Sequence, residues 1–128
     1  MDNKNQIIED AIRAFTQNRT EEQLADTLSV FRQNLDKELI VSVVQSGEGL
    51  TLSPVRTSNG KQWFTVFTSF DEQLKGKAQV QSMFSASLEK VFKVALESDN
   101  IDGVIINPYG NSISLERPIL QVVLGKAR

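Results

Sequence analysis

Apolar residues recur at helical spacing in the first quarter of the chain. Between Gln6 and Phe15 they stand three or four positions apart, which places them on one face of a helix. Thr20 followed by Gln23 has the spacing of a capping box and predicts the start of a second helix. Because the connection is short, we expect an antiparallel hairpin over residues 6–35. The two apolar stripes are Ile7, Ile8, Ala11, Ile12 and Phe15, then Leu24, Leu28, Phe31 and Leu35.

The pattern changes to that of β-strands after Glu38. The unbroken apolar run over residues 39–44 predicts a strand covered on both faces. Residues 50–55 predict a second strand, which Pro54 makes an edge strand or bends with a bulge. Asn59-Gly60 predicts a two-residue hairpin turn of the primed type, with positive φ at both positions. The returning strand, residues 62–68, is rich in aromatic and β-branched residues and is expected to be central.

Helical and strand patterns alternate in the second half of the chain. Ser69 and Glu72 predict a short capped helix that ends by Gly76, and residues 79–84 a short strand. An amphipathic helix is predicted over residues 87–98. Residues 103–107 predict a buried strand. Pro108 is expected to hold Asn107 in an extended conformation before a turn at Gly110.

The closing segment is ambiguous between two structures. Ile113 to Leu115 could form a strand, while Ser114 is also placed to cap a short helix, with proline tolerated in its first turn. We favour the helix, whose apolar residues are Ile119, Leu120, Val123 and Leu124.

These elements predict one α+β domain over residues 1–128, because the chain shows no repeat, low-complexity tract or linker. We expect a mixed sheet of about five strands packed with helices and preceded by the helical hairpin.

Composition excludes several kinds of chemistry. The chain contains no cysteine and no histidine, so disulfides, zinc sites of the usual kind, thiol nucleophiles and histidine acid–base pairs are absent. Sixteen acidic residues leave oxygen-only metal sites and carboxylate or serine chemistry open. We therefore expect no cofactor, and catalysis is disfavoured.

Net charge and hydropathy limit the classes of partner and the cellular locations that the sequence favours. The net charge is only −2 and the fourteen basic residues are scattered, which argues against nucleic acid. No apolar run approaches the roughly 20 residues that span a bilayer, and the first residues lack an apolar signal core. We therefore expect no membrane partner and a cytoplasmic location.

Three segments together resemble the SseB N-terminal domain family. They are Trp63-Phe64-Thr65-Val66-Phe67-Thr68-Ser69, the helix of Leu88 to Leu96, and Gly103-Val104-Ile105-Ile106-Asn107-Pro108. The resemblance covers residues 39–124. It implies a bacterial protein associated with serine sensitivity, and it implies no established reaction, cofactor or catalytic residue. We expect the chain to lack the second, C-terminal domain of longer members, and any role that resides there.

A candidate site lies where two strands are predicted to end. If the strands of residues 62–68 and 103–107 are parallel neighbours, polar and turn residues at their ends converge at one edge of the sheet, a frequent ligand position. These residues are Thr68, Ser69, Asn107, Pro108 and Gly110. In the alternative interpretation, Ser69 only caps a helix and Asn107 only satisfies loop backbone.

Two other groups admit a functional interpretation. Trp63, Phe64 and Phe67 could form an aromatic recognition surface, although core packing explains them more simply. Glu97, Asp99 and Asp102 could offer oxygen ligands to a cation, but a solvated helix end and loop is the simpler interpretation, because the spaced loop of an EF-hand is missing.

The sequence therefore supports two hypotheses about function. The first is a non-catalytic binding or regulatory module that contacts another protein, with which homodimerisation is compatible. The alternative is a small-ligand-binding protein or an enzyme that uses Thr68, Ser69 and Asn107.

Overall fold

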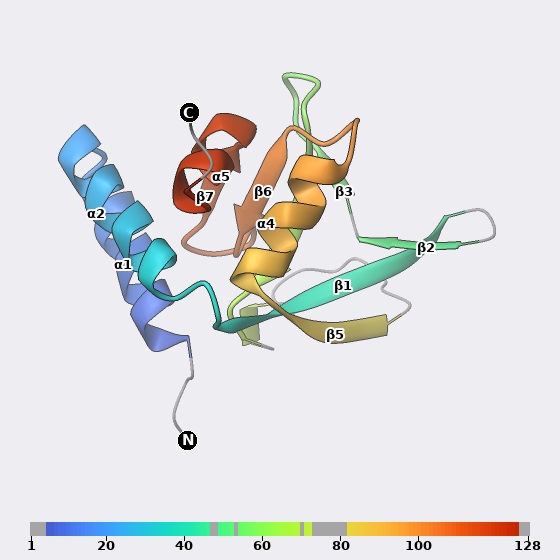
Figure 1. Ribbon diagram of the computed structural model, residues 1–128, viewed down its shortest axis with the longest axis horizontal. Coiled ribbons are helices and arrows are strands. Elements are labelled where there is room, and N and C mark those ends of the chain that lie inside the picture. Colours follow the sequence, from blue (N-terminus) through green and yellow to red (C-terminus); the bar gives the residue numbers. More distant parts are fainter. Residues whose placement is uncertain (1–4, 47–48, 53, 70, 73–81, 126–128) are drawn as a thin grey trace.

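The computed structural model describes residues 5–46, 49–52, 54–69, 71–72 and 82–125. Its elements confirm the α+β class, with a helical hairpin first and a mixed sheet after it (Figure 1). In chain order they are α1 (Gln6–Gln17), α2 (Glu21–Gln33), β1 (Glu38–Ser46), β2 (Gly49–Leu52), β3 (Pro54–Arg56), β4 (Gln62–Phe67), β5 (Ser82–Ser87), α4 (Leu88–Glu97), β6 (Gly103–Ile106), β7 (Ile113–Glu116) and α5 (Arg117–Val123).

The sheet is built around β4, as its aromatic and β-branched sequence predicts. This strand pairs antiparallel with β1 and β3 along one edge and parallel with β6 along the other. β7 extends the sheet beyond β6, while β2 and β5 both pair with β1. Seven strands are described because the second predicted strand is divided into β2 and β3, with Pro54 beginning β3, and because the closing segment contributes β7.

The helical hairpin is confirmed together with its predicted cap. The Thr20 hydroxyl accepts a hydrogen bond from the Gln23 backbone N–H at 3.1 Å. Thr27, fully buried, donates to the Ala11 carbonyl and so ties α2 to α1. Ile7 departs from the predicted stripe, since it is 51% exposed while Ile8 and Ile12 are buried.

One hydrophobic core joins the hairpin to the sheet. On the face covered by α4 and α5, the rows Phe64–Val104–Leu115 and Val66–Ile106–Ile113 are buried, and they pack with the apolar side of α4 (Figure 1). Ile8, Ile12 and Phe31 belong to the same cluster. Burial of each such side chain stabilises the folded protein by about 1.5–3 kcal/mol relative to leaving it exposed to water.

The aromatic residues of β4 are packed inside the protein. Trp63, Phe64 and Phe67 are at most 5% exposed, so the recognition-surface interpretation is wrong and the core interpretation is right. The Trp63 ring crosses β6 at Gly103. A Cβ added there would stand 2.9 Å from the ring and 2.1 Å from the Leu115 carbonyl oxygen, which explains the glycine.

The turn between β3 and β4 differs from the prediction. Gly60 has φ +87°, but Asn59 has a negative φ, so the turn is not of the primed type. The Gly60 N–H donates to the Thr57 carbonyl, and the Thr57 N–H donates to the Lys61 carbonyl. A three-residue loop with one left-handed glycine therefore replaces the predicted two-residue turn.

The closing segment forms both of the predicted alternatives in succession. β7 ends at Glu116, which precedes α5 directly, so Ser114 does not cap that helix. The alternation of β7 buries Ile113 and Leu115 and exposes Ser114 and Glu116. Strand and helix share this segment because the apolar spacing changes from two to three or four at its middle.

The structure describes only some of the residues for which elements were predicted between Ser69 and Ser98. Glu72 N–H donates to the Ser69 hydroxyl, as the capping pattern predicts, whereas residues 70 and 73–81 lie outside the described residues. The next described strand is β5, residues 82–87. α4 begins after Ser87, whose hydroxyl accepts from Lys90 N–H, which confirms the amphipathic helix.

Candidate functional site

Thr68 and Asn107 lie together at the ends of parallel strands β4 and β6. The Thr68 N–H donates to Asn107 Oδ1 at 2.9 Å, and Asn107 Nδ2 donates to Thr68 Oγ1 at 3.0 Å. Both residues are 3% exposed. The predicted convergence of these two residues is confirmed, and their side chains are already engaged with one another.

The first helix closes this end of the sheet. Asn5, which precedes α1, donates through Nδ2 to the carbonyl oxygens of Thr68 and Glu38, both at 2.8 Å. Glu9, one turn later, accepts a hydrogen bond from the Thr68 hydroxyl. Asn5 thus joins the end of β4 to the start of β1, and α1 supplies polar groups that the predicted site lacks. We call Asn5, Glu9, Thr68 and Asn107 the sheet-end cluster.

Asn107 adopts a conformation that the sequence interpretation misses. Its φ is +57°, so the expectation of an extended residue held by Pro108 is wrong. The left-handed region is unfavourable for residues other than glycine, although asparagine tolerates it better than most. The two side-chain bonds to Thr68 offset that strain, and the Asn107 carbonyl accepts from Gly110 N–H to close the turn.

The remaining predicted site residues lie beside the cluster. Ser69 is half-buried and its hydroxyl caps the backbone at Glu72. Pro108 is half-buried and Gly110 is exposed in the turn after β6. Between them, Tyr109 stacks on Phe67 with ring centroids 5.8 Å apart. These residues shape the turn.

Asn5 and Glu9 could not be assigned to this site from the sequence. Asn5 stands where a helix cap is expected, but its side chain makes no capping bond and reaches strands 33 and 63 positions away. The sequence indicates of Glu9 only that it is an acidic residue in the first turn of a helix, where it complements the helix dipole. Local patterns give no account of contacts at that separation.

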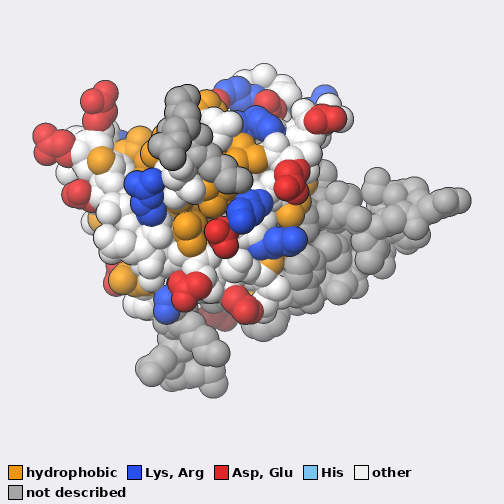
Figure 2. Space-filling view, in the orientation of Figure 1, with side chains coloured by type: hydrophobic (Ala, Val, Ile, Leu, Met, Phe, Trp, Pro, Cys, Tyr) orange, Lys and Arg blue, Asp and Glu red, His pale blue; other side chains and the backbone are white. Residues whose placement is uncertain are grey.

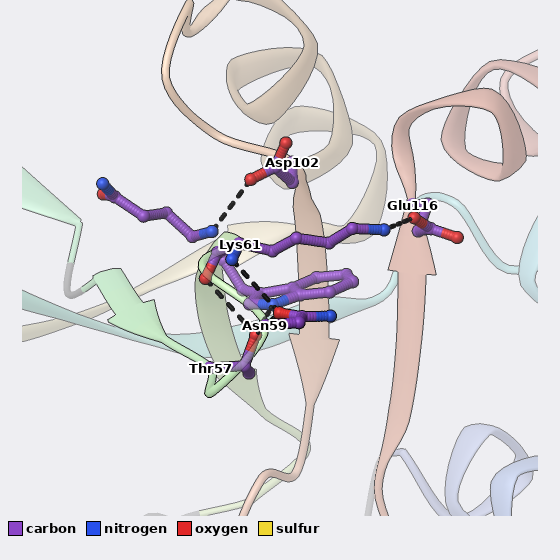
Figure 3. Close-up of polar contacts among 7 residues, drawn as sticks. Thr57, Asn59, Lys61, Asp102 and Glu116 are labelled. Carbon is purple, nitrogen blue, oxygen red and sulfur yellow. Dashed lines mark hydrogen bonds and ion pairs between the residues drawn. The ribbon is translucent and has the colours of Figure 1, made fainter.

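A second polar group lies at the opposite end of β4 (Figure 3). Lys61 forms an ion pair with Glu116, which raises the pKa of the lysine and joins the β3–β4 turn to β7. The Asp102 carboxylate accepts from the Gln62 N–H at 2.9 Å. The Asp102 contact fixes the start of β4, whereas the ion pair is exposed and contributes little to stability.

No three acidic side chains of the described residues come close enough together to hold a metal ion. The cation interpretation of Glu97, Asp99 and Asp102 therefore gains no support.

A groove lies between α2 and α5. It has a volume of about 230 Å³. Val122 forms part of its wall and is 46% exposed, one of three large apolar side chains of the described residues that remain exposed. Figure 2 shows hydrophobic side chains exposed between the helical hairpin and α4. The groove is lined by Ala25, Leu28, Ser29, Arg32, Val122 and Val123.

Comparison of the chain with protein-family models, with curated proteins and with solved structures finds no match. Among the described helices, none has both the length and the apolar character that crossing a membrane requires.

Proposed function

We propose that the chain is a non-catalytic binding module that contacts another polypeptide through the groove between α2 and α5. The observation that carries the proposal is the groove itself, with apolar walls, one cationic side chain at its edge and the exposed Val122. Apolar surface that remains exposed beside a depression is typical of sites that bind another molecule.

The state of the sheet-end cluster supports the same proposal. An enzyme or small-ligand site at Thr68, Ser69 and Asn107 needs polar atoms that face an open cavity. Thr68 and Asn107 are instead buried, bonded to each other and covered by α1. A protein ligand also fits the scattered basic residues better than nucleic acid does.

The resemblance to the SseB N-terminal domain family is part of this proposal. Its support is that the two motif segments end neighbouring parallel strands, with α4 between them in the chain. A role in the response to serine follows from that resemblance. It is tested by deleting the gene in the native cell and comparing growth with and without added serine.

The binding proposal is tested by substitution at the rim of the groove. The full chain and its Val122→Gln variant are used to capture proteins from native cells, and the affinity of each captured protein is then measured with purified components. Because the glutamine variant loses the apolar contact that Val122 makes with the partner, we expect its binding to be at least about tenfold weaker.

Ile7→Gln is the matched control. Ile7 is an exposed apolar residue on α1, outside the groove, and the substitution makes the same kind of chemical change. It should leave binding unchanged, and both variants should melt as the original chain does. Captured proteins that bind all three forms equally would refute the groove as the binding surface.

A further inference from the structure

The groove-facing side of α2 carries opposite charges at its two ends. Ala25, Ser29 and Arg32 are exposed on this face, at helical spacing. One turn before Ala25, Glu21 and Glu22 continue the same face. Within the described part of the chain, Glu21, Glu22 and Arg32 make no ion pair with one another or with other residues. Figure 2 shows acidic side chains gathered at the outer end of the hairpin.

The middle of this face allows close approach of another helix. Ala25 and Ser29 have short side chains, so a second helix can lie at the separation of about 8–10 Å that packed helices adopt. The second helix then packs between Val122 on one side and α2 on the other, above Leu28 and Val123. The shape therefore suits a helix better than an extended peptide.

The charges are spaced for an antiparallel copy of α2. The centre of the face lies near residues 26 and 27. Arg32 is about five residues to one side and Glu21 and Glu22 about five to the other, so each is about 8 Å from the centre along the helix. A two-fold axis through that centre places Arg32 of one copy opposite Glu21 and Glu22 of the other, twice. Two-fold interfaces require this kind of self-complementary surface.

We infer that the occupant of the groove is α2 of a second copy of this chain. The protein then forms a two-fold symmetric dimer in which two antiparallel α2 helices pack against each other and against both α5 helices. This inference rests on the proposed function, since it names the polypeptide that the same groove binds.

The test measures the mass of the full chain by sedimentation over a dilution series. A dimer is expected. Val122→Gln and Arg32→Glu should each raise its dissociation constant at least about tenfold, because the first removes apolar contact and the second opposes like charges. Ile7→Gln replaces an exposed apolar residue and Lys90→Glu reverses a positive charge, both outside the groove. These two controls should leave the dissociation constant unchanged.

A mixing experiment tests the charge pairing directly. The Arg32→Glu chain and a chain with Glu21→Arg and Glu22→Arg should each dimerise poorly alone, because like charges face each other. Mixed in equal amounts, they should form a heterodimer in which every pair is opposite in sign. Rescue on mixing also shows that both variants are folded.

Three results separate this inference from the proposed function. A chain that is monomeric at all concentrations, yet captures a different protein through Val122, overturns the dimer and leaves the proposed function standing. A monomer without any capture that depends on Val122 overturns both. A dimer that Arg32→Glu and Val122→Gln do not affect overturns the inferred interface.

Discussion

Asn107 shows how one side chain can hold an unfavourable backbone in place. Its positive φ directs the chain from β6 into the turn that ends at Gly110. The side chain accepts from Thr68 N–H and donates to the Thr68 hydroxyl, so β4 and β6 are linked beyond their last paired residues. Because the pair is buried, losing these bonds also leaves the Thr68 backbone N–H without its acceptor.

Replacement of Asn107 should therefore lower stability without weakening partner binding per folded molecule. We expect Asn107→Ala to reduce the free energy of unfolding by about 2–3 kcal/mol. Asn107→Gly should recover about 0.5–1 kcal/mol of that loss, because glycine accepts positive φ. Chemical denaturation measures both. Asn111→Ala, one residue after the turn and exposed, serves as the control and should change little. Weakened binding at unchanged stability would instead place Asn107 in a recognition site.

At the scale of elements, the C-terminal end of α4 depends on a residue from another helix. Arg117, the first residue of α5, donates through Nη1 to the carbonyl oxygens of Ala95, Ser98 and Ile101 at 2.9–3.0 Å, and through Nη2 to that of Leu96. Helices leave their last carbonyls unsatisfied, and a cation there also complements the helix dipole. Arg117 thereby fixes the direction in which α5 leaves β7.

Arg117→Met should show how much this contact contributes. Methionine keeps much of the side-chain length but removes every donor, so we expect the free energy of unfolding to fall by about 2–3 kcal/mol. Arg117→Lys keeps the positive charge but lacks the planar fork of five donors, and its loss should be smaller. Thermal unfolding followed by circular dichroism ranks the three proteins. Equal melting temperatures for the original chain and the methionine variant would contradict the capping role.

For the whole molecule, the helical hairpin and the sheet share one hydrophobic core. Ile8, Ile12 and Phe31 are fully buried in the same cluster as Leu39 and Val41 of β1. Asn5 and Glu9 add polar contacts to the ends of the strands. The hairpin carries both the groove face of α2 and the cover of the sheet-end cluster, so the proposed binding surface belongs to a part of the chain that shares the core.

Removal of residues 1–37 should consequently unfold the remainder or cause it to aggregate. The deletion removes three fully buried side chains and exposes the residues they pack against. Burial of each such side chain contributes about 1.5–3 kcal/mol, and together they make up a large part of the usual 5–15 kcal/mol of net stability. Light scattering and circular dichroism report the outcome. A chain shortened only by residues 1–4 is the control and should fold. A monomeric fragment from Glu38 with the original melting temperature would contradict a shared core.

Local patterns were sufficient to predict most elements and the pairing at the centre of the sheet. The capping hydroxyl of Thr20 and the apolar faces of α1 and α4 follow from spacings of three and four residues, which act within one helix. The motifs ending at Thr68 and Asn107 also predicted that these residues meet, because the ends of neighbouring parallel strands lie at one edge.

Only the tertiary structure decided what those residues contact and which surface remains open. Asn5 reaches Thr68 across 63 positions and Arg117 reaches α4 across as many as 22, so no local spacing encodes either contact. The positive φ of Asn107 depends on bonds to another strand, which override the extended preference before proline. The groove likewise exists only because packing places α5 beside α2. The sequence alone determines which residues can form helices and strands, whereas burial and long-range hydrogen bonds determine which side chains remain exposed at the surface.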